Sequence, residues 1–151
     1  MWEFNGLPLH VLVVHSAVVF GPLAALAGIA YAVLPRYRDR LRWVTAVVVG
    51  IAFVTIWTAY FTGDNFLENA SQFQNLGGEA LEKIENHEEL ADTLRWITTG
   101  FAVVTAVAVW QHAREGAARY ALSGLVVVGA VLTLVWTVMT GDAGAQAVWG
   151  S

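Results

Sequence analysis

The sequence contains no cysteine, and only 13% of its 151 residues are charged. The missing thiols exclude disulfide bonds, thiolate metal sites, iron–sulfur clusters and cysteine nucleophiles. Soluble domains have about 25% charged residues. The low charge, together with a hydrophobic content of 57%, therefore indicates an integral membrane protein. We expect the lipid bilayer as its main partner, and no nucleic acid.

Four apolar runs divide the chain, and each is long enough, or nearly so, to cross a bilayer as a helix. The first, Leu7 to Leu34, has 28 residues without an acid, a lysine or an arginine. The expected helices cover residues 7–34, 43–63, 79–112 and 120–141. We therefore predict an all-α protein, a single four-helix transmembrane bundle over residues 1–151, whose third helix begins outside the membrane.

Basic residues are concentrated in the two short loops that join the first helix to the second and the third to the fourth. These loops hold six of the eight lysines and arginines: Arg36, Arg38, Arg40, Arg42, Arg114 and Arg119. Cytoplasmic loops of membrane proteins carry such an excess of positive charge. We expect these loops in the cytoplasm, both termini and the long middle loop outside, and a location in the cell (inner) membrane.

The motif Thr-Gly-Asp occurs twice, at residues 62–64 and 140–142, near the ends of the second and fourth runs. His10 lies 54 residues before Asp64, and His87 lies 55 before Asp142. The sequence thus predicts two helical hairpins that form a parallel pseudo-repeat about an axis along the membrane normal. A glycine followed by a solvated acid is also typical of a helix end.

Three histidines and two aspartates are expected at the outer surface. Counting about 20 residues of hydrocarbon core from the cytoplasmic edge places His15 at the outer edge, with His10 and His87 about one turn further out. Ionisable groups in such positions usually serve a function or pair with a polar partner. Imidazole ligates haem iron, zinc and copper, and carboxylates complete metal shells. The candidate ligands are His10, His87, His15, Asp64 and Asp142.

The pattern leaves several alternatives open. His10 and His87 suit a bis-histidine haem b or a zinc or copper ion, whereas His15 is displaced from His10 by about 140° around a regular helix. Arg95 extends toward the membrane surface or pairs with Asp92, and the third alternative is a contact with a haem propionate. All the histidines could instead be structural. His112 is interpreted as an interfacial residue.

Two classes of function remain. One is a haem or metal protein of the outer face, with electron transfer as its expected role. The other is an accessory or assembly subunit of a larger membrane complex with structural histidines, and a homodimer suits either class. The sequence has no nucleophile elbow, phosphate loop or zincin helix, so it does not indicate an enzyme.

The stretch LPLHVLVVH, the two Thr-Gly-Asp motifs and the histidine in NHEELA resemble a bacterial family of small four-helix membrane proteins, domain of unknown function 2231. The family pattern has an aromatic residue and a proline after its histidine pair, whereas Ser16 and Ala17 follow His15 here. The resemblance implies an integral membrane bundle and supports His10, His15 and His87 as site residues. It supplies no activity.

Overall fold

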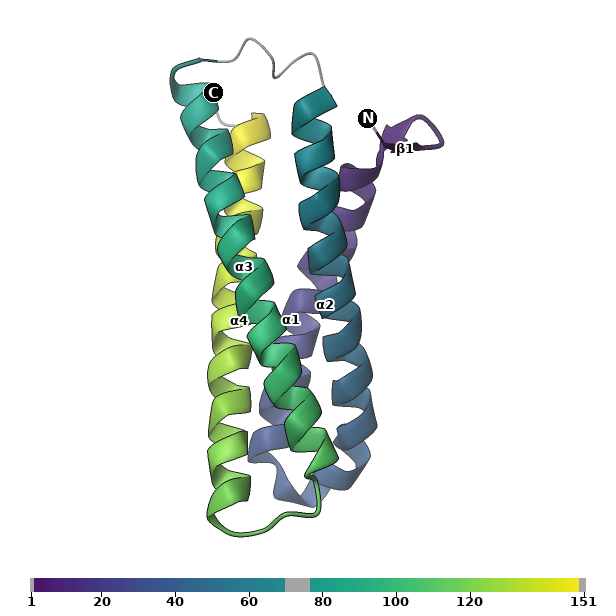
Figure 1. Ribbon diagram of the computed structural model, residues 1–151, viewed down its shortest axis with the longest axis vertical. Helices are drawn as coiled ribbons and strands as arrows, with labels where there is room; N and C mark the ends of the chain where they lie inside the picture. Colours follow the sequence, from purple (N-terminus) through teal and green to yellow (C-terminus); the bar gives the residue numbers. More distant parts are fainter. Residues whose placement is uncertain (1, 70–76, 150–151) are drawn as a thin grey trace.

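The structure is a computed structural model that describes residues 2–69 and 77–149. Four long helices, α1 (Leu9–Val33), α2 (Arg38–Asn69), α3 (Glu79–Trp110) and α4 (Ala117–Trp149), form an elongated bundle (Figure 1). Each is long and apolar enough to cross a membrane. The predicted all-α architecture with four candidate transmembrane helices is therefore confirmed.

The bundle has two chemically different ends (Figure 1). At one end lie the starts of α1 and α3 and the ends of α2 and α4; we call it the histidine end, after His10 and His87. At the other end, a short 3-10 helix, η1 (Pro35–Tyr37), joins α1 to α2, and a loop joins α3 to α4. We call this the arginine end, after the six arginines that the sequence places there. Arg36 and Arg114 lie in the two connections, whereas the other four lie in the first turns of α2 and α4.

Each helix packs mainly against two neighbours, in the cyclic order α1, α2, α3, α4. Small residues on α1 make this possible, since Ala17, Gly21, Ala24 and Gly28 are all buried. A Cβ on Gly28 would lie 2.8 Å from the ring of Phe101, and one on Gly129 would lie 3.1 Å from the same side chain. Phe101 of α3 thus fills the centre of the bundle between α1 and α4. Such a row of small buried residues is typical of close helix packing in lipid.

The Thr-Gly-Asp motifs do not end their helices, so that part of the prediction is wrong. α2 continues past Asp64 to Asn69, and α4 continues past Asp142 to Trp149. Gly63 and Gly141 are not among the glycines with positive φ, a group that comprises Gly6, Gly78 and Gly116. The apolar runs end at these motifs, but both helices continue beyond them for at least one further turn.

A small β-hairpin precedes α1. Its strands β1 (Glu3–Phe4) and β2 (Leu7–Pro8) pair in antiparallel fashion. The turn between them is Asn5-Gly6, with φ angles of 56° and 80°, as a tight two-residue hairpin turn requires. The backbone N–H of Trp2 donates to Asn65 Oδ1 at 2.8 Å. The hairpin is thereby attached to the last part of α2.

Candidate functional site

His10, in the first turn of α1, is held against α2. Its Nδ1 lies 3.0 Å from the carbonyl oxygen of Ala59 and 3.4 Å from the hydroxyl of Thr62. The imidazole stacks on Phe66, with ring centroids 6.1 Å apart. It also lies so close to Gly63 that a Cβ there would be 3.1 Å from His10 Cε1. The absence of a side chain at Gly63 therefore creates the space for this ring.

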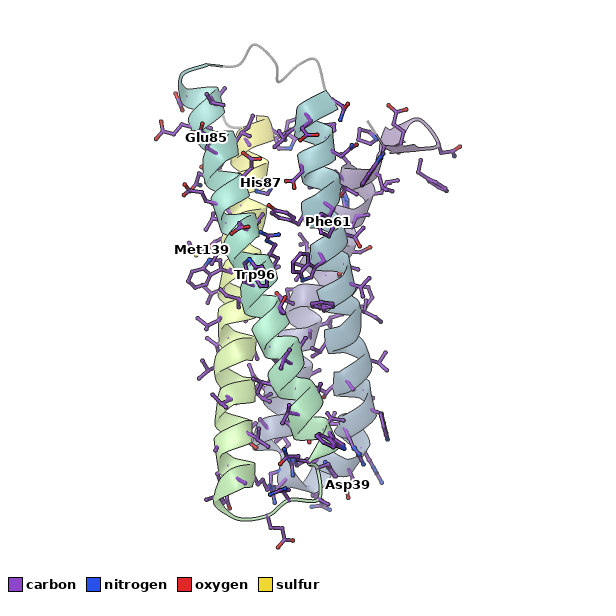
Figure 2. The ribbon with its side chains drawn as sticks, in the orientation of Figure 1. Asp39, Phe61, Glu85, His87, Trp96 and Met139 are labelled. Atoms are coloured by element: carbon purple, nitrogen blue, oxygen red, sulfur yellow. The ribbon has the colours of Figure 1, made fainter. Side chains whose placement is uncertain are left out.

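His87, in the third turn of α3, is held against α4 in the same way (Figure 2). Its Nδ1 lies 3.0 Å from the carbonyl oxygen of Thr140. A Cβ on Gly144 would be 2.9 Å from His87 Cε1. In both hairpins, the glycine beside the ring comes four residues after the carbonyl that binds it.

These contacts determine the tautomer of both rings. A carbonyl oxygen only accepts hydrogen bonds, so the Nδ1 of His10 and of His87 must carry the proton. In the neutral imidazole, Nε2 then keeps its lone pair. A ligating histidine typically donates its second ring N–H to a carbonyl or carboxylate, which orients the ring. Both side chains are half-buried, and they lie within electrostatic range of each other.

The two histidines do not contact equivalent positions of the Thr-Gly-Asp motifs. His10 lies against Gly63 of the first motif, but His87 lies against Gly144, which comes after the second motif. The nearest atom to a Cβ on Gly141 would be Val18 Cγ2, at 3.9 Å. The nearly equal sequence offsets therefore do not correspond to equal contacts, and the pseudo-repeat stays a prediction.

The other expected ligands point elsewhere. His15 is exposed, and its Nδ1 bonds the carbonyl of Val11 in its own helix at 2.6 Å. Asp142 is exposed and accepts from Gln146 at 2.7 Å. The Asp64 carboxylate lies within electrostatic range of the Arg95 guanidinium. Within residues 2–69 and 77–149, no three His, Asp or Glu side chains come together as a metal site.

Arg95 lies in a cage of aromatic rings between α2 and α3. Its Cζ is 3.9 Å from the ring centroid of Tyr60, 5.1 Å from Trp57 and 5.3 Å from Trp96. The guanidinium also pairs with Asp92, as one of the three alternatives for this residue predicts. Trp57 Nε1 donates to Thr99 Oγ1 at 3.0 Å, which fixes one wall of the cage.

A family model described as "Predicted membrane protein (DUF2231)" matches residues 6–151. The chain is a member of the DUF2231 family. This confirms the resemblance stated above from the histidine and Thr-Gly-Asp motifs. No curated protein and no solved structure matches the chain. Membership of DUF2231 thus agrees with the membrane architecture.

In this DUF2231 protein, a second polar cluster lies at the arginine end, around His112. His112 Nε2 is 2.6 Å from Asp39 Oδ1, and its Nδ1 is 3.2 Å from the hydroxyl of Tyr31. Tyr31 is only 1% exposed, and its hydroxyl donates to the carbonyl of Ala108 at 3.0 Å. Arg38 Nη1 donates to the carbonyl of His112 at 3.1 Å. Tyr31 and Arg38 thus supply donors to carbonyls at the end of α3, which lack partners in their own helix.

The sequence reasoning gave His112 only an interfacial position and missed its partners. Tyr31 and Asp39 are separated from it by 81 and 73 residues, so no local spacing connects the three. One signal was present. A tyrosine in an apolar run needs a partner for its hydroxyl when it is buried, and His112 is the histidine at that depth.

Proposed function

We propose that this DUF2231 protein binds haem b at the histidine end, with Nε2 of His10 and of His87 as the axial ligands. The observation that carries the proposal is the matched orientation of the two rings. Each donates Nδ1–H to a main-chain carbonyl of a neighbouring helix, and this arrangement leaves Nε2 unprotonated for a metal.

The donor set favours haem over a bare ion. A structural zinc site needs about four protein ligands, whereas the described residues bring together no group of three. A haem iron needs only two ligands from the protein, since the porphyrin supplies the other four. The half-buried surroundings of the two rings would restrict the access of water. A bis-histidine haem supplies one-electron transfer, so the chain would act as an electron carrier.

The alternative is an accessory subunit in which both histidines are structural. Each ring bonds across its own hairpin, from α1 to α2 and from α3 to α4. Such bonds contribute about 0.5–1.5 kcal/mol each to stability. This reading needs no cofactor, so the two functions differ in what purified protein contains.

The test is to purify the chain gently from its native membrane and record its absorption spectrum. We expect a Soret band with the bands of a bis-histidine haem, and its loss in His10→Gln and in His87→Gln. His15→Gln is the matched control, because it removes an exposed imidazole from the same helix as His10. Elemental analysis of the same sample detects zinc or copper. If the purified protein contains no haem and still folds after both substitutions, the haem proposal is refuted and the accessory-subunit function is the one that stands.

A further inference from the structure

The arginine end carries a surplus of positive charge that the protein itself does not neutralise. It holds six arginines and two acids, Asp39 and Glu115. Asp39 is bound to His112. Among the described residues, Arg95 forms an ion pair with a carboxylate, and it lies in the other half of the bundle. None of the ion pairs in this part of the chain involves the six arginines of the arginine end. An anion from outside the chain is therefore the natural partner of this end.

Three of these arginines, from two different hairpins, surround the buried Tyr31 of α1. Arg38 and Arg42 of α2 and Arg119 of α4 all lie within electrostatic range of the hydroxyl of Tyr31. Arg38 is only 6% exposed and is fixed by its bond to the carbonyl of His112 and by the ring of Tyr31, 4.9 Å from its Cζ. Arg38 therefore contributes charge from below the surface. Arg42 and Arg119 are partly exposed, so of these three arginines they are the ones that an external group can reach.

Exposed aromatic rings indicate the depth of this cluster in the membrane. Trp43 is 64% exposed, Trp110 82% and Tyr120 74%. Tryptophan and tyrosine are enriched where the bilayer meets water, at the level of the lipid headgroups. Arg42 lies over Trp43, with Cζ 4.8 Å from the ring centroid. The arginines thus occupy the same level as phospholipid phosphates, and α2 continues from Arg42 and Trp43 into exposed apolar residues such as Val44 and Val47.

We propose that the arginine end binds the headgroup of an anionic phospholipid, with Arg42 and Arg119 contacting its phosphate. A guanidinium forms paired hydrogen bonds with phosphate oxygens. Basic clusters beside transmembrane helices bind anionic lipids on this principle. The exposed apolar residues of α2 below the cluster give the acyl chains a surface. This favours a lipid over a free anion. The site is independent of the histidines and of any haem.

The experiment is native mass spectrometry of the full chain in a neutral detergent, with equal amounts of phosphatidylglycerol and phosphatidylcholine. We expect the wild-type protein to retain phosphatidylglycerol preferentially. Each arginine near an anionic surface contributes enough to change affinity about fivefold, so Arg42→Gln and Arg119→Gln should each weaken retention by about this factor. Lys83→Gln, which removes one positive charge at the histidine end, should leave it unchanged.

Three outcomes would overturn the proposal. One is equal retention of the two lipids by wild-type protein, a result that does not depend on any variant. Another is displacement of phosphatidylglycerol by inorganic phosphate at equal concentration, which would mean a site for a free anion. The third is full retention by the folded variants. If a glutamine variant does not fold, Arg42→Lys and Arg119→Lys keep the charge, and their retention should fall between wild type and zero because the paired hydrogen bonds are lost.

Discussion

Replacement of Gly144 by alanine tests whether the glycines, and not the Thr-Gly-Asp motifs, determine the position of the histidines. The new Cβ would lie 2.9 Å from His87 Cε1. Carbon atoms in ordinary contact are about 3.5–4.0 Å apart. The ring must therefore move by about 0.6–1.1 Å, which disturbs the contact that its Nδ1 makes with the Thr140 carbonyl at 3.0 Å.

Such a shift has a predictable cost. Moving the ring lengthens the Nδ1 contact to the Thr140 carbonyl beyond about 3.5 Å, where it is no longer a hydrogen bond. The loss amounts to about 0.5–1.5 kcal/mol, and forcing an extra methyl group into a packed position adds about 1–3 kcal/mol. Alanine restores up to about 1 kcal/mol through its higher helix propensity. We expect Gly144→Ala to destabilise the bundle by about 0.5–3.5 kcal/mol in net terms.

The assay is reversible denaturation in mixed micelles, followed by far-UV circular dichroism, with the NMR signals of the His87 ring as a local readout. Gly141→Ala, one turn earlier on α4, is the matched control because its Cβ would meet Val18 at an ordinary 3.9 Å. Gly124→Ala is a second control, since nothing lies within 4 Å of its Cβ. Both should be neutral or stabilising. Equal stability of Gly144→Ala and Gly141→Ala, with an unchanged His87 ring, would refute the reasoning.

Two further predictions concern the arginine end. Tyr31→Phe removes a buried hydroxyl that caps the end of α3 and contacts His112, so it should destabilise the protein by about 1–3 kcal/mol. Tyr120→Phe is the control, because the Tyr120 ring is exposed, and it should change the denaturation midpoint little. Identical effects of the two substitutions would contradict the role of Tyr31. For topology, we expect a cytoplasmic signal from a reporter fused after Tyr37 and an exported signal from one fused after Gly78, and the opposite pair of signals would show an inverted orientation.

The fold was largely predictable from the sequence because the bilayer constrains helices strongly. Long apolar runs indicate spans, and every backbone group in lipid has to be bonded within its own helix. The ends were less predictable. α2 begins at Arg38 and α4 ends at Trp149, each several residues beyond the apolar run. Helices continue into water wherever no residue terminates them, and hydropathy does not detect that extension.

Only those features of the candidate site that depend on positions within one helix were predictable from the sequence. His10 and His87 lie on the faces of their helices that pack against α2 and α4. His15 is five residues after His10, so it faces away and bonds its own helix. The approach of Gly144 to His87 was not predictable, because the glycine contact depends on the axial offset between α3 and α4. A one-turn difference in that offset exchanges Gly141 for Gly144.

The contrast between His15 and the other two shows what distinguishes a candidate ligand in this bundle. All three place Nδ1 against a main-chain carbonyl. For His15 the carbonyl belongs to the same helix, so the bond restrains nothing beyond one turn. For His10 and His87 the carbonyl belongs to a neighbouring helix. The ring packs against a glycine that follows this carbonyl by four residues. A restraint between helices fixes the direction of Nε2, as ligation requires. In related sequences, the feature to examine is therefore a glycine facing the histidine across the hairpin, whether or not a Thr-Gly-Asp motif includes it.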